Sequence, residues 1–422
     1  MRRVVDMPSI ADALRSTLGA AQLDVAQRLA SACEELGCQA YIVGGTVRDA
    51  LLGLPAADLD VTVVSPPDDF PKRVAAFLGA RLIMASQFGT AKLEKEGSTL
   101  DLVMARSERY RSPGALPDVT AGSLDDDLTR RDFAINAMAA SLDAAKWGEL
   151  VDPHGGRRDL ELGLVRALHE RSFQDDATRI LRAARYASRF GFRLDAETAK
   201  QIERSGGYLV SISPDRFKHE LERVFEESRV SSAIELLSKW EMLGLTGGDF
   251  VYDETSWSGF AEACPVGSSE RRLVGWGVFS LCFQTVRSSG IALRWKLDHD
   301  ASMVSMDALK LRERLRVSDL NNLAPSGQVA LLENYSPYAV LAFQLSTRDG
   351  TTNDALDEYR TKLTSIRPDL DGHDVIALGV PRGPRVGEAL QMLKNARLDR
   401  TVESRNDETL LVRQFVTKLD QE

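Results

Sequence analysis

The sequence predicts an α/β domain at the start of the chain, followed by a long all-helical region. Over residues 20–150, short strand-like runs are interspersed with amphipathic helical runs, which is the pattern of mixed α/β folds. After Gly155, helical patterns dominate nearly to the C-terminus, and no repeat of fixed period is present. We therefore expect three regions, which cover residues 20–150, 151–230 and 231–422.

The composition is that of a globular protein with a large core. Of the 422 residues, 43% are hydrophobic, and the formal net charge is −9. An acidic chain does not resemble a general nucleic-acid coat protein, although a local basic groove is compatible with it. The four cysteines and five histidines are scattered and form no C-x-x-C pair, so a zinc site is disfavoured and a reducing cytoplasm is expected.

No segment is expected to act as a signal peptide or to span a membrane. The first residues, MRRVVDMPSIADAL, lack a continuous apolar stretch. The most apolar internal run, Leu273–Val286, is too short to cross a bilayer. We expect this run to form a buried helix.

Five elements are expected in the first region, in chain order. Leu23–Gly37 is an amphipathic helix that ends at a glycine, and Gln39–Gly45 is a strand that leads into a turn. A short helix follows at Thr46–Gly53 and ends at a glycine close to a proline. Asp58–Val64 and Thr99–Ala105 alternate between polar and apolar residues, which predicts two half-buried strands.

Three carboxylates are expected on the polar faces of these two strands. Asp58, Asp60 and Thr62 share one face of the first strand, because side chains alternate along a strand, and Asp101 lies on the polar face of the second. Neighbouring carboxylates repel each other, and Mg²⁺ is commonly bound through one or two carboxylates together with substrate phosphates. The pattern predicts Mg²⁺ at Asp58 and Asp60, with Asp101 placed to assist an attacking hydroxyl.

A glycine turn precedes this pair of carboxylates. Gly44 and Gly45 lie between the expected strand and helix, where their backbone N–H groups can approach an anion. Arg48, one turn into the helix, can direct a guanidinium to the same phosphates. A turn that holds a triphosphate and a carboxylate pair that holds Mg²⁺ are together what nucleotidyl transfer requires.

Five ordered motifs resemble those of one enzyme family. They are GGTVRDALLGLPAADLD, DDDLTRRDFAINAMA, VDPHGGRRDLELGLVRAL, QDDATRILRAARYASRFGFRL and ISPDRFKHELERVF. The chain is thereby similar to the class II tRNA nucleotidyltransferases and bacterial poly(A) polymerases of the polymerase β superfamily. The resemblance is dense over Gly44–Phe225. A weaker similarity to the family's tail lies in GPRVGEALQMLKNARLDR near the C-terminus.

The resemblance implies a fold and an active site. Residues 20–150 would form a polymerase-β-like nucleotidyltransferase head, residues 151–230 a helical neck that reads the nucleobase and binds RNA, and residues 231–422 a helical body and tail that bind tRNA. In the R-R-D motif, Arg131 and Asp132 would contact the incoming nucleotide.

The fourth motif is expected to choose the base. Asp176, Arg179, Arg182, Arg185 and Arg189 recur at steps of three and four residues, which predicts one helix face that lacks balancing acids after Asp176 and favours a polyanion partner. The resemblance implies that Asp176 accepts from the amino group of cytosine or adenine and that Arg179 donates to the same base edge. Arg182 and Arg185 would then hold phosphates.

The implied reaction is template-independent transfer of CMP and/or AMP from CTP and ATP to the 3′ end of tRNA, that is, CCA addition, in the cytoplasm and with Mg²⁺. Enzymes that add only CC, only A, or a poly(A) tail are alternatives. A catalytically inactive RNA-binding protein is an alternative from another class, against which the presence of both Asp58 and Asp60 speaks. Ala105–Val119 bears on the choice of product, and Gly247–Ser269 is expected to be a loop-rich hinge.

Overall fold

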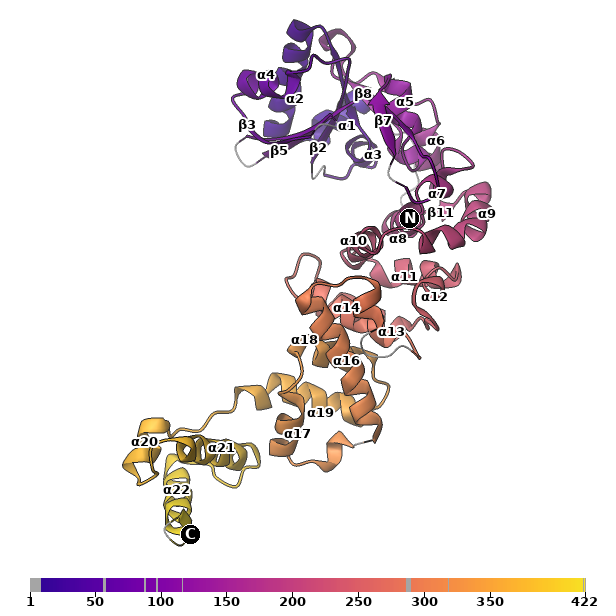
Figure 1. Ribbon diagram of the computed structural model, residues 1–422. Helices are drawn as coiled ribbons and strands as arrows, with labels where there is room; N and C mark the ends of the chain where they lie inside the picture. The colour runs from indigo at the N-terminus through magenta and orange to yellow at the C-terminus, as the bar shows by residue number, and fades with distance from the viewer. Residues whose placement is uncertain are drawn as a thin grey trace. The chain divides into compact units, whose positions relative to one another are not determined.

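The computed structural model describes residues 9–55, 58–86, 89–95, 98–115, 117–285, 290–317, 319–419 and 421. The chain divides into two compact units, which are described separately here. The first unit comprises Met1–Glu220 and Lys239–Thr246, and the second comprises Leu221–Ser238 and Gly247–Glu422. Figure 1 labels the elements of both units in chain order.

A seven-stranded sheet forms the centre of the first unit (Figure 1). Its strand order is β3-β4-β5-β2-β1-β8-β9; β2 and β5 pair in parallel, and the other neighbours pair antiparallel. β6 and β7 form a separate antiparallel hairpin, and β10 and β11 a short parallel pair. The strands are β1 (Gln39–Val43), β2 (Leu59–Val64), β3 (Arg81–Ala85), β4 (Thr90–Lys95), β5 (Ser98–Met104), β6 (Arg106–Arg109), β7 (Asp118–Ala121), β8 (Ala139–Ser141), β9 (Leu150–Val151), β10 (Leu164–Val165) and β11 (Arg193–Leu194).

Helices surround this sheet and continue beyond it in the chain. α1 packs against α3, so the folded head begins before residue 20. The helix α10 crosses the boundary between the two units. The helices are α1 (Ile10–Thr17), α2 (Ala20–Leu36), α3 (Gly45–Leu51), α4 (Phe70–Leu78), α5 (Leu124–Thr129), η1 (Ala134–Asn136), η2 (Ala144–Lys146), α6 (Gly156–Leu162), α7 (Ser172–Asp175), α8 (Thr178–Phe190), α9 (Ala196–Ser205), η3 (Gly206–Val210), α10 (Pro214–Phe225) and α12 (Gly244–Gly247).

The alternation predicted for the carboxylate strand is present in β2. Leu59, Val61 and Val63 are at most 1% exposed. They lie on the face of the sheet that is covered by α2 and α4, two helices that pack together (Figure 1). On the opposite face, Thr62 is also fully buried because α5 covers it. Asp127 of that helix accepts a hydrogen bond from the hydroxyl of Thr62. The polar face of β2 is therefore partly enclosed by protein rather than solvated along its length.

The second unit is helical, as the sequence predicts, and has an aromatic core. Phe225 packs against Trp257, Phe260 and Trp276, with ring centroids 5.8, 6.3 and 5.5 Å away. The helices are α11 (Val230–Lys239), α13 (Glu254–Ala263), α14 (Arg271–Leu281), α15 (Gly290–Arg294), α16 (His299–Val317), η4 (Leu320–Asn322), α17 (Pro325–Leu332), α18 (Pro337–Ser346), α19 (Gly350–Thr361), η5 (Leu363–Ser365), α20 (Gly372–Ala377), α21 (Pro384–Leu398) and α22 (Arg405–Leu419).

The expectation of a loop-rich segment over Gly247–Ser269 holds only at its two ends, since residues 248–253 and 264–269 lie outside helices. This segment contains the ten-residue helix α13, which begins after Asp253, whose side chain accepts from the N–H of Thr255. Trp257 and Phe260 are three residues apart on this helix and are both fully buried. Burial of two aromatic rings outweighs the turn-forming glycines and serines that surround them in the sequence.

The buried helix expected at Leu273–Val286 is confirmed in its main part. α14 begins at Arg271 and ends at Leu281, and most of its side chains are buried. Val286 lies outside the described residues. Over the part of the chain that the structure describes, no helix is both long enough and apolar enough to cross a membrane.

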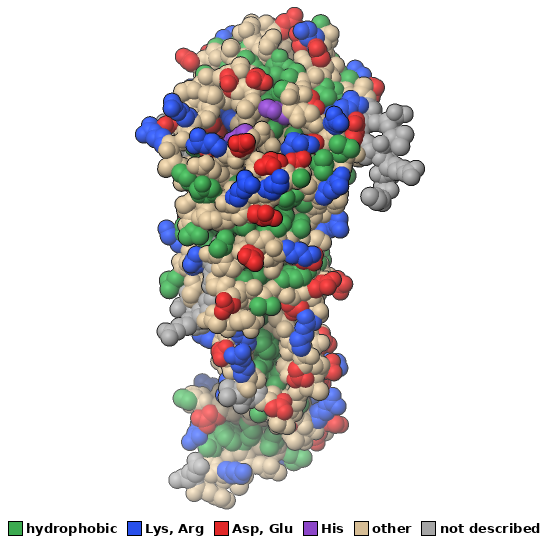
Figure 2. All heavy atoms as spheres, turned by 90° about the vertical axis from the view of Figure 1, so that its right-hand side faces the viewer, with side chains coloured by type: hydrophobic (Ala, Val, Ile, Leu, Met, Phe, Trp, Pro, Cys, Tyr) green, Lys and Arg blue, Asp and Glu red, His purple; other side chains and the backbone are tan. Residues whose placement is uncertain are grey.

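Charge is not segregated on the face of the molecule that Figure 2 shows. Basic and acidic side chains are interspersed there, with hydrophobic side chains between them. This face therefore carries no large patch of one sign that would mark it as the surface for a polyanion.

A glycine in α14 gives a test of the helical core. α14 packs against α18, and a Cβ atom on Gly277 would lie 2.6 Å from the Cβ of Ala342. We expect Gly277→Ala to lower the free energy of unfolding by about 1–3 kcal/mol, because it overpacks this contact.

Gly387→Ala in α21 is the control, since no atom lies within 4 Å of its added Cβ. It should raise the free energy of unfolding by about 0.5–1 kcal/mol. Urea unfolding followed by circular dichroism measures both, and equal effects would contradict the packing.

Candidate active site

The structure brings the three predicted carboxylates together on two neighbouring strands. Asp60 and Asp101 lie directly opposite each other in the parallel ladder of β2 and β5. Asp58 is exposed and stands immediately before β2, where Thr99 donates a hydrogen bond of 3.1 Å to its carboxylate. Asp101 lies 3.6 Å from the ammonium of Lys92. Because residues paired in a parallel ladder project to the same face of the sheet, Asp60 and Asp101 lie side by side on one face.

Mutual repulsion is visible in the electrostatics of Asp60. Burial raises the pKa of Asp60 and the charge of Asp101 raises it further, while Arg131 lowers it. Asp58 adds to the rise, and Arg48 opposes it. The sum is a pKa above the ordinary value for an aspartate, so the protein alone does not neutralise this group of acids.

These residues fit a divalent cation that completes its shell with substrate. Within the described ranges, no group of three or more His, Cys, Asp or Glu side chains is arranged as a ready-made metal site. Mg²⁺ does not need one, because it is usually held by one or two carboxylates with water and phosphate oxygens as the other ligands. An exposed Asp58 beside a half-buried, charge-destabilised Asp60 is such a donor set.

A buried threonine fixes the glycine turn against the carboxylate strand. Thr46, in α3, is 4% exposed. Its hydroxyl donates to the backbone carbonyl of Asp58 at 3.1 Å and accepts from the backbone N–H of Asp60 at 3.3 Å. The helix that follows the glycine turn is therefore hydrogen-bonded to the start of β2, which connects the two predicted parts of the site.

Gly44 meets two requirements that exclude a side chain. Its φ angle is +67°, a left-handed conformation that favours glycine. A Cβ atom on Gly44 would also lie 2.7 Å from Nη1 of Arg131. The guanidinium of Arg131 therefore rests against the backbone of the turn, where Gly45 begins α3.

Arg48 has other partners than the phosphates expected for it. It is 4% exposed, and Nε donates to Asp49 at 2.8 Å while Nη1 donates to Asn136 at 2.5 Å. Its guanidinium also lies over the rings of Tyr186 and Phe190, at 5.2 and 4.9 Å. Arg48 thus joins α3 to α8 as a buried connection, which the sequence, showing only a helical arginine, does not reveal.

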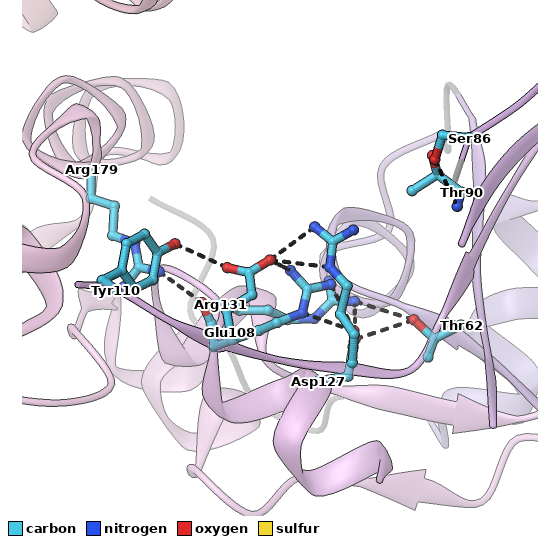
Figure 3. A network of polar contacts seen from close by, with 10 residues as sticks. Thr62, Ser86, Thr90, Glu108, Tyr110, Asp127, Arg131 and Arg179 are labelled. Carbon is cyan, nitrogen blue, oxygen red and sulfur yellow. Dashed lines mark hydrogen bonds and ion pairs between the residues drawn. The ribbon is translucent and has the colours of Figure 1, made fainter. Parts of the chain in front are cut away.

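Arg131 is held by a residue that the sequence analysis did not single out. Nη2 of Arg131 donates to Asp127 at 2.8 Å and lies 3.4 Å from the hydroxyl of Thr62 (Figure 3). Asp127 is completely buried. Its position four residues before Arg131 on α5 is the spacing of an ion pair along a helix, and this was the available signal.

Asp132 is buried and fully hydrogen-bonded. One of its oxygens accepts from the N–H of Phe133 at 2.8 Å and from the amide of Asn136 at 2.9 Å, and the other accepts from Arg182 at 2.8 Å. Burial raises the pKa of Asp132, but the charge of Arg182 and the hydrogen bond from Asn136 outweigh burial and lower the pKa to about 2. Asp132 is therefore ionised at neutral pH and joins α8 to the segment after α5.

Asp176 does not lie on the same helix as the arginines, contrary to the prediction. It follows the short helix α7, and its Oδ1 accepts from the N–H and the hydroxyl of Thr178, at 2.9 and 2.6 Å. Arg216 also contacts Oδ1, at 2.7 Å. Among the described residues, none donates a hydrogen bond to Oδ2. The carboxylate is thus fixed through one oxygen, and the other is left to accept.

Arg179 is buried but keeps free donors. It is 5% exposed, Nη1 donates to Ser172 at 2.7 Å, and Nη2 donates to the carbonyl of Arg130 at 2.7 Å. A guanidinium has five N–H donors, so these two bonds set its orientation without using all of them.

The expected lack of balancing acids along α8 is wrong. Glu220 of α10 lies 3.1 Å from Arg185 and 3.5 Å from Arg182, and Asp132 also pairs with Arg182. Arg185 is 7% exposed and Glu220 is 7% exposed, so theirs is a buried pair. These acids belong to elements that are distant from α8 in the sequence, so the residue pattern of α8 alone does not predict them. The premise that α8 needs a polyanion therefore fails.

The segment Ala105–Val119, which is expected to bear on the choice of product, contributes to the hairpin of β6 and β7. Glu108 on β6 accepts from Tyr110 at 2.9 Å and from Arg130 at 3.1 Å. Arg130 also donates to Asp127, at 3.0 Å. The hairpin is thereby joined to α5 and, through it, to the carboxylate strand.

Comparison with known proteins identifies two family models in this chain. Residues 40–166 match the model described as "Poly A polymerase head domain". Residues 191–244 match the model described as "Probable RNA and SrmB- binding site of polymerase A". The first match covers the sheet and the carboxylate site described above.

Two curated relatives are similar over most of their length. An A-adding tRNA nucleotidyltransferase of Halalkalibacterium halodurans is 32% identical over 425 residues, which cover 96% of this chain and 96% of the relative. A CC-adding tRNA nucleotidyltransferase of Deinococcus radiodurans is 31% identical over 380 residues, 89% of each chain.

Solved structures of CCA-adding enzymes share the fold. An apo form superposes with a TM-score of 0.83 at 26% identity and covers 97% of this chain and 100% of its own. The Thermotoga maritima enzyme complexed with tRNA has a TM-score of 0.81 at 25% identity, over 98% and 100%. A complex with ATP has a TM-score of 0.79 at 26% identity, over 99% of each chain. The predicted α/β head and helical remainder are thus confirmed, and the chain belongs to the tRNA nucleotidyltransferase and poly(A) polymerase family of nucleotide-transferring enzymes.

Proposed function

We propose that this chain transfers nucleoside monophosphates from CTP and/or ATP to the 3′ end of tRNA, without a nucleic-acid template. The observation that carries the proposal is the group of acids on β2 and β5 beside the glycine turn. Asp60 faces Asp101 and follows the exposed Asp58, and Arg131 lies against Gly44 at the same edge. Carboxylates for a cation and an arginine for phosphates, on rigid elements, form the minimal equipment for phosphoryl transfer.

Asp58 and Asp60 are the proposed Mg²⁺ ligands. Bound Mg²⁺ would neutralise charge on the triphosphate and lower the pKa of the attacking 3′ hydroxyl. Asp101 lies opposite Asp60 and is proposed to orient that hydroxyl and accept its proton. Pyrophosphate is the leaving group.

The nucleotide is assigned to the turn and to the neck. Gly44 and Gly45 allow the triphosphate to approach the backbone, and Arg131 donates to it from above the turn. Oδ2 of Asp176 accepts from the amino group of cytosine or adenine, and the unused donors of Arg179 meet the ring acceptor on the same edge. Uracil and guanine place a carbonyl where the amino group should be, and thus leave a carboxylate unpaired.

Asp132 and Arg182 form an ion pair with each other. They are proposed to hold the nucleotide-binding residues in place rather than to contact the nucleotide. Arg48 and Arg185 are likewise assigned to the frame that joins head and neck, because each is less than 8% exposed and has a polar partner within the protein. These four residues act on the substrate through the residues that they position.

The proposed partner is the acceptor end of tRNA, in the cytoplasm. The structural relatives described above include an enzyme bound to tRNA, and RNA duplexes are recognised mostly through shape and backbone. AMP addition to a tRNA that ends in CC is the activity expected at minimum, because the relative that matches 96% of this chain is an A-adding enzyme. CMP addition is the second candidate, favoured by the CC-adding relative.

The test uses three tRNA transcripts, which end before CCA, after C, and after CC. Each is incubated with labelled CTP or ATP in Mg²⁺. Incorporation of AMP into the CC-ending transcript supports the proposal, and the other two transcripts reveal whether CMP is also added. If no transcript accepts either nucleotide, the proposed reaction is wrong. An unlimited run of AMP on unrelated RNA would instead indicate a poly(A) polymerase.

Asp60→Asn should separate activity from stability. The loss of a metal-binding charge should reduce nucleotide addition by about 10²–10³-fold or more. Because the folded-state pKa of Asp60 lies above its ordinary value, its ionised form opposes folding above that pH, so the neutral amide should leave the melting temperature unchanged or raise it. The two measurements are incorporation of labelled AMP and thermal melting at neutral pH, with tRNA binding retained as the control. Substantial residual activity would remove Asp60 from the metal site.

Asp176→Asn should change the choice of base. The amide oxygen can remain with Thr178 and Arg216, while an NH₂ donor replaces Oδ2. A donor pairs with the carbonyl of uracil rather than with an amino group, so the preference for CTP over UTP should fall by about 1–3 kcal/mol. Thr178→Val, which removes a donor to Oδ1 only, should keep the wild-type ratios. The measurement is kcat/KM for all four triphosphates, and unchanged ratios in Asp176→Asn would place base choice elsewhere.

Arg185→Met should act on stability and not on nucleotide binding. It leaves buried Glu220 without one of its two arginines, which should cost about 3 kcal/mol of unfolding free energy. The double variant with Glu220→Gln should recover part of this loss. Denaturant unfolding and the KM for ATP are measured together. A raised KM with unchanged stability would restore the phosphate role expected from the sequence.

A further inference from the structure

A buried carboxylate stands directly behind the arginine of the glycine turn. Asp127 lies on α5, is completely buried, and carries no function in the reaction proposed above. Its two oxygens are divided between two arginines. Oδ1 accepts from Nε and Nη2 of Arg130, at 3.0 and 2.6 Å, and Oδ2 accepts from Nη2 of Arg131 at 2.8 Å.

The contacts of Arg131 are one-sided. Nη2 is taken by Asp127 and lies near Thr62, whereas Nη1 rests against Gly44. Nε is buried and has no hydrogen-bond partner among the described residues. Nη2 is thus fixed to the protein, and Nη1 is left as the donor group beside the turn.

Asp127 is also fixed to the strand that carries the catalytic acids. Thr62 is buried on β2, two residues after Asp60, and its hydroxyl lies 3.2 Å from Oδ2 of Asp127. The start of α5 is closed by a capping box, in which Ser123 accepts from the N–H of Asp126 and the Asp126 carboxylate accepts from the N–H of Ser123. The anchor of Arg131 is therefore part of a rigid helix that is hydrogen-bonded to β2.

The two arginines depend on Asp127 to different degrees. Arg130 has a second carboxylate, because its Nη1 donates to Glu108 at 3.1 Å. For Arg131, Asp127 is the carboxylate in hydrogen-bond contact. Loss of Asp127 would therefore remove the charged hydrogen bond that holds Arg131 beside the turn.

We propose that Asp127 is a positioning residue, which holds Arg131 at the glycine turn for the phosphates of the incoming nucleotide. This inference rests on the proposed function, since it assumes that Arg131 binds the nucleotide. Asp127 itself touches neither substrate nor cation. Its effect on the reaction passes through Arg131 and should vanish when Arg131 is absent.

A double-mutant cycle tests this dependence. Asp127→Asn should raise the KM for ATP at least about tenfold, since a hydrogen bond between charged groups is lost, while kcat at saturating ATP falls much less. Arg131→Ala should raise KM by a similar factor. In the Arg131→Ala background, Asp127→Asn should add less than about twofold, because the residue through which it acts is gone.

Two further variants separate positioning from folding. Asp159→Asn is the matched control, since Asp159 is also buried, at 2% exposure, and pairs with Arg166 rather than with Arg131. It should lower the melting temperature and leave KM unchanged. Thr62→Val keeps the charge of Asp127 but removes one of its bonds, so it should raise KM in the same direction and remain measurable if Asp127→Asn fails to fold.

The outcomes distinguish the nucleotide-binding role of Arg131 from the positioning role of Asp127. If Arg131→Ala leaves KM unchanged, the nucleotide role of Arg131 is wrong, and the proposed function must be revised at this residue. If Arg131→Ala raises KM but Asp127→Asn and Thr62→Val do not, the positioning role alone is overturned. Equal effects of Asp127→Asn with and without Arg131 would also overturn it, because they would show action by another route.

Discussion

The site depends on the parallel pairing of β2 with β5. Their register sets Asp60 opposite Asp101, and Asp58 stands one step before the same strand. Burial on the sheet raises the pKa of Asp60, and the charge of Asp101, which the strand pairing holds beside it, raises the pKa further. The fold therefore holds negative charges close together, and a divalent cation bound with a triphosphate can neutralise them.

The surrounding arginines form their hydrogen bonds and ion pairs with other residues rather than with these three acids. Arg131 is tied to Asp127, Arg48 to Asp49 and Asn136, and the arginines of α8 to acids outside that helix. Each of these arginines has a carboxylate or amide partner of its own, whereas Lys92 lies 3.6 Å from Asp101 itself. The pairs also join α3, α5, α8 and α10, so the same contacts that keep the cation site open connect the head to the neck within the first unit.

The sequence was sufficient for what depends on local pattern. The alternation of β2, the glycine turn and the carboxylates were predicted from spacing, and Gly44 is required for reasons of both φ and space. The partners of the arginines could not be predicted, because Glu220 and Asn136 are distant in the chain from Arg185 and Arg48. Asp176 was placed on the arginine helix because its spacing fits, whereas its side chain in fact accepts from the first turn of that helix.

The central claim is that Asp60 binds the catalytic cation, and exchange of its ligand atom tests this most directly. In Asp60→Cys a thiolate replaces the carboxylate, and thiolates favour softer metals than Mg²⁺. The account predicts that this variant adds little AMP to a CC-ending tRNA in Mg²⁺ and regains activity in Mn²⁺ or Cd²⁺, whereas the wild type prefers Mg²⁺. A variant that retains the wild-type rate and metal preference would contradict it.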